Sequence, residues 1–487
     1  MLDELPTEVL SLIFSKLCLH CQTDRGSTAH DVSFRRDDQQ HDDPSWYLKE
    51  HQALFSVCLA SKRLYGIAQP VLHHAFMPGY GDSRRSSRST WDGRLTAFMR
   101  TMTERRDLAS MVRRVYINHY LIERIDLQQA EYAFGHAAAA LGIDDYWTPE
   151  PFLTTTPGYC VTLQWQQELG GAVVQMLVLL LPNLQHLGLQ VNHEFPFREY
   201  PAAVAFSAVG NSAGQSLKTL DIALHVKKSK QRMQILLLGK QAQAILKMAQ
   251  NLSTLNLHML RTTSNEPTLN VLRNLRVLRV THSRVSEEGL EALLCSCSNL
   301  ETFVYEATTL PEMELNSFSH APVSDHFQPA QAIRHLRSHH RTLKSLHLDL
   351  RKFNFPSNCH IRPILSITDF GSLRELFLSY NTIYNKHSKP AMSNADYLPQ
   401  LLPSNIVSLR LAGTSMRHYE QDHVTGLHSL ARAVSSGQFP NLKLIRCDAR
   451  QRLDGRGLEE LFAGAGVDFG YEDMPMKRSY TAAAHCH

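Results

Sequence analysis

The chain has 487 residues, of which 43% are hydrophobic and 20% charged, so several domains or a domain with a repeat array are expected, and disorder throughout is excluded. The formal net charge of +4 at pH 7 lacks the concentrated basicity of a nucleic-acid groove. The opening MLDELPTEV is acidic where a secretory signal needs a basic and then an apolar stretch, and the nine cysteines are an odd number. We therefore expect reduced thiols and a location in the cytoplasm or nucleus.

The first predicted elements are three short helices. Pro6 suits a first helical turn, and apolar residues then recur with helical spacing as far as Leu17. A second stretch with this periodicity runs from Leu54 to Tyr65, and a third element begins at Gly66. Three short helices cannot bury this much apolar surface among themselves, so part of it is expected to meet something else.

The string LPTEVLSLIFSKL, followed by LFSVCLASKRLYGIAQPVLHHAF, resembles the F-box in its order of a Leu-Pro helix start, two apolar periodicities and a Cys-x-x-Ser-Lys-Arg-x-Tyr segment. The resemblance implies a three-helix F-box over residues 1–76 that binds a Skp-type adaptor, and through it the cullin scaffold and RING subunit of an SCF-type ubiquitin ligase. Ordinary amphipathic helices of an unrelated bundle are the alternative. The adaptor-binding residues implied are Leu5, Pro6, Val9, Leu10, Ile13, Phe14, Leu17, Leu54, Val57, Cys58 and Leu64.

The sequence departs from the compact F-box pattern in a polar insert over residues 19–52, rich in His, Asp and Arg. Loop closure costs only about 0.6 kcal/mol more per doubling of loop length, so the helices are expected to survive and the insert to be disordered. The insert departs from the adaptor-binding surface at the end of the first helix and could cover part of that surface. Residues 77–110 are expected to be a linker and a first helix; the basic, serine-rich stretch Ser83–Ser89 is interpreted as a flexible linker, with a phosphorylation or nuclear-import patch as the alternative.

One apolar spacing then recurs nine times: apolar residues at relative positions 0, 3 and 5. Positions 3 and 5 fit the inward-facing residues of a short strand, which is stable only when stacked beside others in a parallel sheet. The pattern predicts an α/β fold, an irregular leucine-rich-repeat solenoid over residues 111–470 with a flexible tail over 471–487, and it resembles the degenerate arrays of fungal F-box proteins. The nine starts are Leu184, Leu217, Leu252, Leu275, Leu300, Leu343, Leu373, Ile406 and Leu442.

The segments around these repeats complete the predicted array. Val112–Ile117 has the same spacing and is expected to be an earlier strand, which leaves residues 118–167 as an insertion or a cap. Outer helices are expected at Ala172–Leu181, Glu287–Leu294 and Leu427–Val434. The run at Ala172–Leu181 is about half the length of a bilayer span and is interpreted as a buried helix.

Residues between the inward apolar positions are expected to lie on the concave face, where solenoids usually bind partners. Aromatic and basic side chains occur there late in the array, and we predict that they contact a protein substrate; a solvated face with no partner is the alternative. Nucleic-acid and membrane partners are not expected. The predicted substrate-binding residues are His347, Phe377, Arg410 and Arg446.

Cys18, His20 and Cys21 are candidates for a zinc site, because paired cysteines and spaced histidines can close a tetrahedral site. The downstream histidines, His30, His41 and His51, have no fixed close spacing, and 26 histidines supply accidental neighbours, so no metal site is expected. The pair Cys295 and Cys297 is interpreted as small buried residues, and the terminal run Ala484–His487 as too short to be a site.

The sequence contains no P-loop, dinucleotide fingerprint, HExxH or GxSxG element, so no cofactor and no catalytic residue are expected. The expected function is that of a non-catalytic substrate-recognition adaptor of an SCF-type ubiquitin ligase. A repeat scaffold that assembles proteins without ubiquitin transfer is the first alternative. A zinc-dependent or hydrolytic enzyme is the second.

Overall fold

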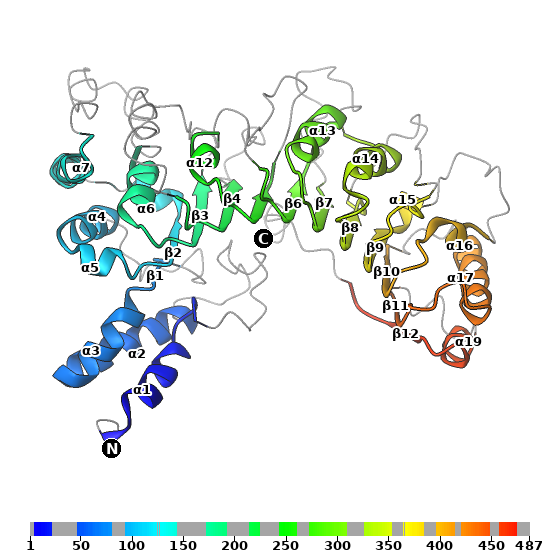
Figure 1. Cartoon of the computed structure of the whole chain (residues 1–487), viewed down its shortest axis with the longest axis horizontal. Coiled ribbons are helices and arrows are strands. Elements are labelled where there is room, and N and C mark those ends of the chain that lie inside the picture. The colour runs from blue at the N-terminus through cyan, green and yellow to red at the C-terminus, as the bar shows by residue number, and fades with distance from the viewer. Residues whose placement is uncertain are drawn as a thin grey trace, which may run out of the picture. The chain divides into compact units, whose positions relative to one another are not determined.

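The computed structural model describes residues 4–21, 46–79, 93–123, 125, 127–143, 172–191, 214–224, 243–260, 272–308, 326–352, 364, 366–383, 396–413, 420–448 and 457–474 (Figure 1). Most of the predicted insert, the stretch Ser83–Ser89, most of the predicted tail and two of the histidines weighed as ligands, His30 and His41, lie outside these ranges.

Three helices open the described chain: α1 (Thr7–Ser15), α2 (Trp46–Ala60) and α3 (Lys62–Leu72). We call them the helical module. They share one apolar cluster in which Leu10 and Phe14 of α1 meet Leu54 and Cys58 of α2 and residues of α3. Only Ser61 separates α2 from α3, and its side chain accepts a hydrogen bond from the backbone nitrogen of Leu64 at 3.1 Å, which caps α3.

Two boundaries of the predicted module need correction. Residues 46–52, assigned to the polar insert, are the first turns of α2, because Tyr47 is buried and belongs to an apolar cluster that includes Leu19 and Met77. At the other end, Ala75–Phe76 is not part of a helix but forms strand β1, which pairs in parallel with β2. The module therefore ends at Leu72 and passes directly into the sheet.

Twelve strands in the described part of the chain form one sheet in sequential order from β1 to β12. The registers described between neighbours are parallel, as in Leu187↔Leu220 and Leu409↔Ile445. All nine repeated patterns coincide with strands, and Val112–Ile117 contains another. The strands are β1 (Ala75–Phe76), β2 (Arg114–Ile117), β3 (His186–Val191), β4 (Thr219–Leu224), β5 (Thr254–His258), β6 (Val277–Ser283), β7 (Thr302–Ala307), β8 (Ser345–Asp349), β9 (Glu375–Ser379), β10 (Ser408–Ala412), β11 (Leu444–Cys447) and β12 (Asp468–Tyr471).

The residue just before each repeated pattern explains why the repeats stack. It is Asn, Ser or Thr in all nine, and in six of them its side chain donates to a backbone carbonyl of the preceding repeat. Asn183 donates to Ser110 O at 2.7 Å, Ser216 to Leu184 O at 2.8 Å, and Asn405 to Gly371 O at 2.8 Å. These bonds satisfy turn carbonyls that no strand partner reaches, so each turn is fixed on the previous one.

Helices occupy many of the connections between strands. Residues 172–180 are helical and buried, and α13 and α17 cover the other two predicted outer helices, so these three predictions are confirmed. None of the described helices is long and apolar enough to cross a bilayer. The connecting helices include α4 (Arg94–Glu104), α5 (Arg106–Ala109), α6 (His119–Glu123), α7 (Leu127–Leu141), α12 (Gln243–Met248), α13 (Glu287–Cys295), α14 (Pro329–Leu336), α15 (Tyr380–Ile383), α16 (Tyr397–Leu401), α17 (Glu420–Ser435) and α19 (Leu458–Gly464).

The described residues divide into two compact units at the bond between Asn256 and Leu257, within β5. The first unit holds the helical module and β1–β4, and the second holds β6–β12. In the first unit, α6 and α7 fall within the region predicted as an insertion or cap. The fold class is therefore α/β, with a parallel sheet and connecting helices.

Candidate functional site

The helical module carries most of the exposed large apolar side chains of the described chain. Eight such residues are found, and six of them lie on α1, α2 and α3, whereas Tyr132 and Leu461 lie elsewhere. We call the six the apolar helical face. Its members, with the exposed fraction of each residue, are Val9 (40%), Leu12 (63%), Ile13 (40%), Phe55 (51%), Leu59 (73%) and Tyr65 (43%).

The spacing of these residues makes strips along the helices rather than scattered points. Val9, Leu12 and Ile13 stand at i, i+3 and i+4 on α1, and Phe55 and Leu59 stand at i and i+4 on α2, so each set shares one side of its helix. The buried residues Leu10 and Phe14 repeat with the same period on the opposite side of α1. Helix α1 is thus apolar on two sides, one that packs in the core of the module and one that is exposed.

A hydrogen bond fixes the start of α1 against α3. The Nη2 atom of Arg63 donates to Leu5 O at 2.7 Å, across 58 residues of sequence. Carbonyl Leu5 O precedes the first turn of α1, whose N-cap, Pro6, makes no side-chain cap bond. The arginine therefore holds the start of α1, with its exposed strip, against α3.

The eleven residues predicted to bind an adaptor divide into three groups by their burial. Leu10, Phe14, Leu54, Cys58 and Leu64 are between 0% and 8% exposed and form the core of the module, so they support the face from beneath and are not available as contacts. Val9, Ile13 and Pro6 are exposed, while Leu5, Leu17 and Val57 are half-buried against the core. Leu12, Phe55, Leu59 and Tyr65 are exposed but were not among the residues predicted from the sequence. The available signal was that the first helix has more apolar residues than one buried stripe needs.

The structure brings the four predicted substrate-binding residues into one row across the second unit. His347 of β8 is in register with Phe377 of β9, Phe377 with Arg410 of β10, and Arg410 with Arg446 of β11. We call these four the sheet row. The apolar neighbours of each along its strand are buried, so the row lies on the opposite face of the sheet from the core.

The aromatic half of the sheet row is ordered by stacking. The rings of His347 and Phe377 are parallel within 3°, with centroids 3.8 Å apart, and the guanidinium carbon of Arg351 lies 5.8 Å from the centroid of Phe377. Arg351 is held by ion pairs to Asp349 at 2.8 Å and to Asp448 at 3.4 Å. A flat aromatic surface edged by a fixed cation results.

The basic half of the sheet row is paired with acids. Arg446 contacts Asp468 at 2.7 Å, and Arg410 contacts Glu472 at 3.5 Å. The hydrogen bond from Arg446 lowers the pKa of Asp468, and the same bond raises the pKa of Arg446. An acidic ligand at this end of the row would therefore compete with carboxylates of the chain itself, which the sequence alone did not indicate.

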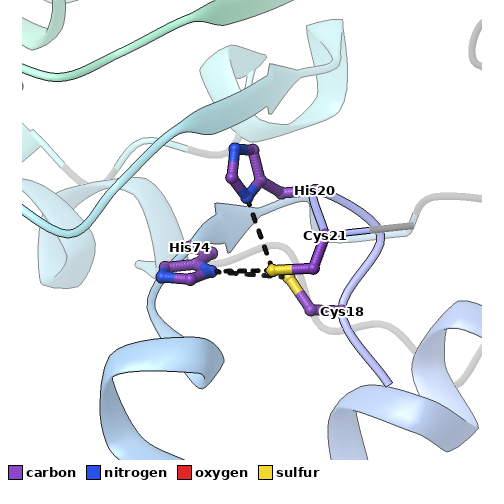
Figure 2. A group of neighbouring side chains, drawn as sticks. All are labelled: Cys18, His20, Cys21 and His74. Carbon is purple, nitrogen blue, oxygen red and sulfur yellow. Dashed lines mark hydrogen bonds between the residues drawn. The ribbon is translucent and has the colours of Figure 1, made fainter. Parts of the chain in front are cut away.

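Four potential metal ligands meet in the first unit, and we call them the Cys–His cluster: Cys18, His20, Cys21 and His74 (Figure 2). The first three follow α1, and His74 lies between α3 and β1. One ligand atom from each lies within 4.8 Å of those from the other three. Three of these residues are the ones considered for zinc from the sequence. Of the histidines considered with them, His51 is in α2 and outside the cluster, while His30 and His41 lie outside the described residues; His74 was not considered.

The chain was also compared with known proteins. A scan against models of protein families found no match, and a search of curated proteins found none.

Proposed function

We propose that the chain is a substrate-recognition adaptor of an SCF-type ubiquitin ligase. In this proposal the helical module acts as an F-box and binds a Skp-type adaptor, while the strands and their returns act as a leucine-rich-repeat solenoid that binds a target protein. The observation that carries the proposal is the apolar helical face. Its six residues lie within 57 positions of one another, from Val9 to Tyr65, in a chain of 487 residues.

A face of this kind is costly to leave in water. Soluble proteins rarely expose contiguous apolar patches above a few hundred Å², and larger ones mark interaction sites. Leu12 and Leu59 are the most exposed of the set, at 63% and 73%, and each stands in a strip of apolar neighbours. We expect the partner of such strips to have an apolar surface of its own. In the proposal, the strips are the F-box surface and the Skp-type adaptor is that partner.

The sheet row supports the second half of the proposal. Stacked His347 and Phe377 give an aromatic surface, and Arg410 remains exposed beside it. Aromatic and arginine side chains are the types that most often dominate protein-binding energies. A target protein bound there would be carried on the same chain as the helical module, and the adaptor's role would be to raise the target's effective concentration near the conjugating enzyme.

Affinity capture tests this function. The full chain and a chain lacking residues 1–76 are each expressed with a tag, and the Skp-type adaptor and the cullin are measured in the captured material. We expect both partners with the full chain and neither with the truncated chain, whose folding is checked by circular dichroism. Adaptor binding by the truncated chain, or none by the full chain, contradicts the proposal; adaptor without cullin favours the scaffold alternative.

A further inference from the structure

The Cys–His cluster lies at a junction that is already rigid. Cys18 is buried in the apolar core of the helical module, while the next residue, Leu19, belongs to the apolar cluster that includes Ala75 of β1 and Met77 just after it. The turn is closed by a bond from Cys21 N to Cys18 O at 3.1 Å. The ligands Cys18, His20 and Cys21 are therefore presented from a fixed turn.

The fourth member is fixed from the other side. His74 N donates to Val71 O at 3.2 Å, at the end of α3, and His74 O accepts from the backbone nitrogens of Arg113 and Arg114, each at 2.9 Å. His74 is thus bonded to both the last turn of α3 and the start of β2. Figure 2 shows its ring directed at the two sulfur atoms, with His20 approaching from another side.

The distances within the cluster are those of ligands around one ion. Tetrahedral zinc holds sulfur at about 2.3 Å and nitrogen at about 2.0–2.1 Å, which places a sulfur and a nitrogen ligand about 3.5 Å apart. The Sγ atom of Cys21 lies 3.6 Å from Nδ1 of His20 and 3.4 Å from Nδ1 of His74, and the Sγ atom of Cys18 lies 3.8 Å from Nδ1 of His74. Both histidines present Nδ1, so a single point is within reach of all four side chains.

The ligand types of the cluster also suit zinc. Cysteine sulfur and histidine nitrogen are the ligands that structural zinc sites use most often, and the cluster supplies two of each.

We infer that Cys18, His20, Cys21 and His74 form a structural zinc site that joins the end of α1 to the junction of α3 and β1. Two sulfur and two nitrogen ligands fill a tetrahedron and leave no open position for a substrate, so the site is structural and not catalytic. Copper is the less favoured ion because two thiolates and two imidazoles in tetrahedral geometry are typical of zinc. The inference is independent of adaptor binding, since it concerns how the module is attached to the sheet.

Metal analysis of the full chain tests the site. The protein is purified under reducing conditions without chelator, and its zinc is measured by mass spectrometry. We expect one zinc ion per chain in the original protein and in the control His73→Gln, because His73 is adjacent to His74 but outside the cluster. Cys21→Ser and His74→Gln are expected to lose most of the metal, at least tenfold in affinity in a competition with a chromophoric chelator.

A cobalt titration keeps the test decisive if a variant does not fold. The original protein, stripped of metal and kept reduced, is titrated with Co²⁺, and the visible bands of a tetrahedral thiolate-bound ion are recorded. We expect saturation at one equivalent and displacement by Zn²⁺. The inference is overturned if the reduced protein neither contains zinc nor shows the cobalt bands. It is also overturned by a Cys18–Cys21 disulfide whose reduction restores no metal binding. Full zinc retention in a folded His74→Gln variant overturns it equally.

Discussion

The sharpest consequence of the apolar helical face concerns Leu12 and Leu59, its two most exposed leucines. Leu→Ala removes about three methylene-sized groups, each worth about 0.8 kcal/mol when buried. Scaling by the exposed fractions of 63% and 73% gives about 1.5 and 1.8 kcal/mol, because only area now in water can be buried by a partner. The double variant Leu12→Ala/Leu59→Ala should therefore weaken adaptor binding by about 3 kcal/mol, on the order of 100-fold in Kd.

The assay measures association and dissociation rates of purified adaptor on the immobilised chain, and we expect most of the change in the dissociation rate. Leu461→Ala is the matched control, because Leu461 is a 45% exposed leucine of α19, in the other unit. Thermal unfolding should be nearly unchanged in all three proteins, since surface substitutions usually shift stability by less than about 0.5 kcal/mol. An unchanged Kd in the double variant, or an equal loss in Leu461→Ala, would refute the assignment of the face.

Three further predictions concern the free energy of unfolding. Phe14→Ala should lower the free energy of unfolding by about 3–5 kcal/mol in urea titrations, because Phe14 is 1% exposed in the core of the module; a loss below about 1 kcal/mol would contradict that core. Burial lowers the pKa of His326 and of His423 to about 3, below the value of about 6.5 in an unfolded chain, so the unfolded state binds more protons and stability falls as pH drops from about 6.5 toward 3. Each of the two histidines should lower the free energy of unfolding by about 2 kcal/mol between pH 7 and pH 5. His423→Gln should therefore reduce this loss of stability by about 2 kcal/mol. An unaltered loss would show that His423 is not buried in its neutral form. Asn405→Ala should cost about 0.5–1.5 kcal/mol by removing the bond to Gly371 O, and full stability in this variant would exclude a role for the residue before each repeat.

The strands were predictable because their signal is local and repeated. The inward-facing residues of one repeat, such as Leu187 and Leu189, recur with the same spacing in the next repeat. Both of these residues are 2% exposed or less. Strand β1 was missed although Leu72, Ala75 and Met77 have the 0, 3, 5 spacing, because the same residues also continued a helical pattern. Strand β12 was missed because Gly466 stands where the pattern requires an apolar residue.

The candidate sites were less accessible from sequence, for two physical reasons. Periodicity identifies apolar residues of a helix but does not say which side meets the core, so Leu10 was grouped with Val9 although one is buried and the other exposed. The Cys–His cluster depends on a contact between Cys21 and His74, 53 positions apart, which local spacing does not encode. The sheet row was found because register in a parallel sheet follows directly from the repeat.

The central claim is that the helical module binds a Skp-type adaptor through apolar surface. Isothermal titration calorimetry of the purified adaptor into the full chain, repeated at several temperatures, measures both the stoichiometry and the heat-capacity change of binding. We expect a one-to-one complex with a negative heat-capacity change, because burial of apolar surface has that sign. No binding heat at any of these temperatures, together with no complex in size-exclusion chromatography, would contradict it.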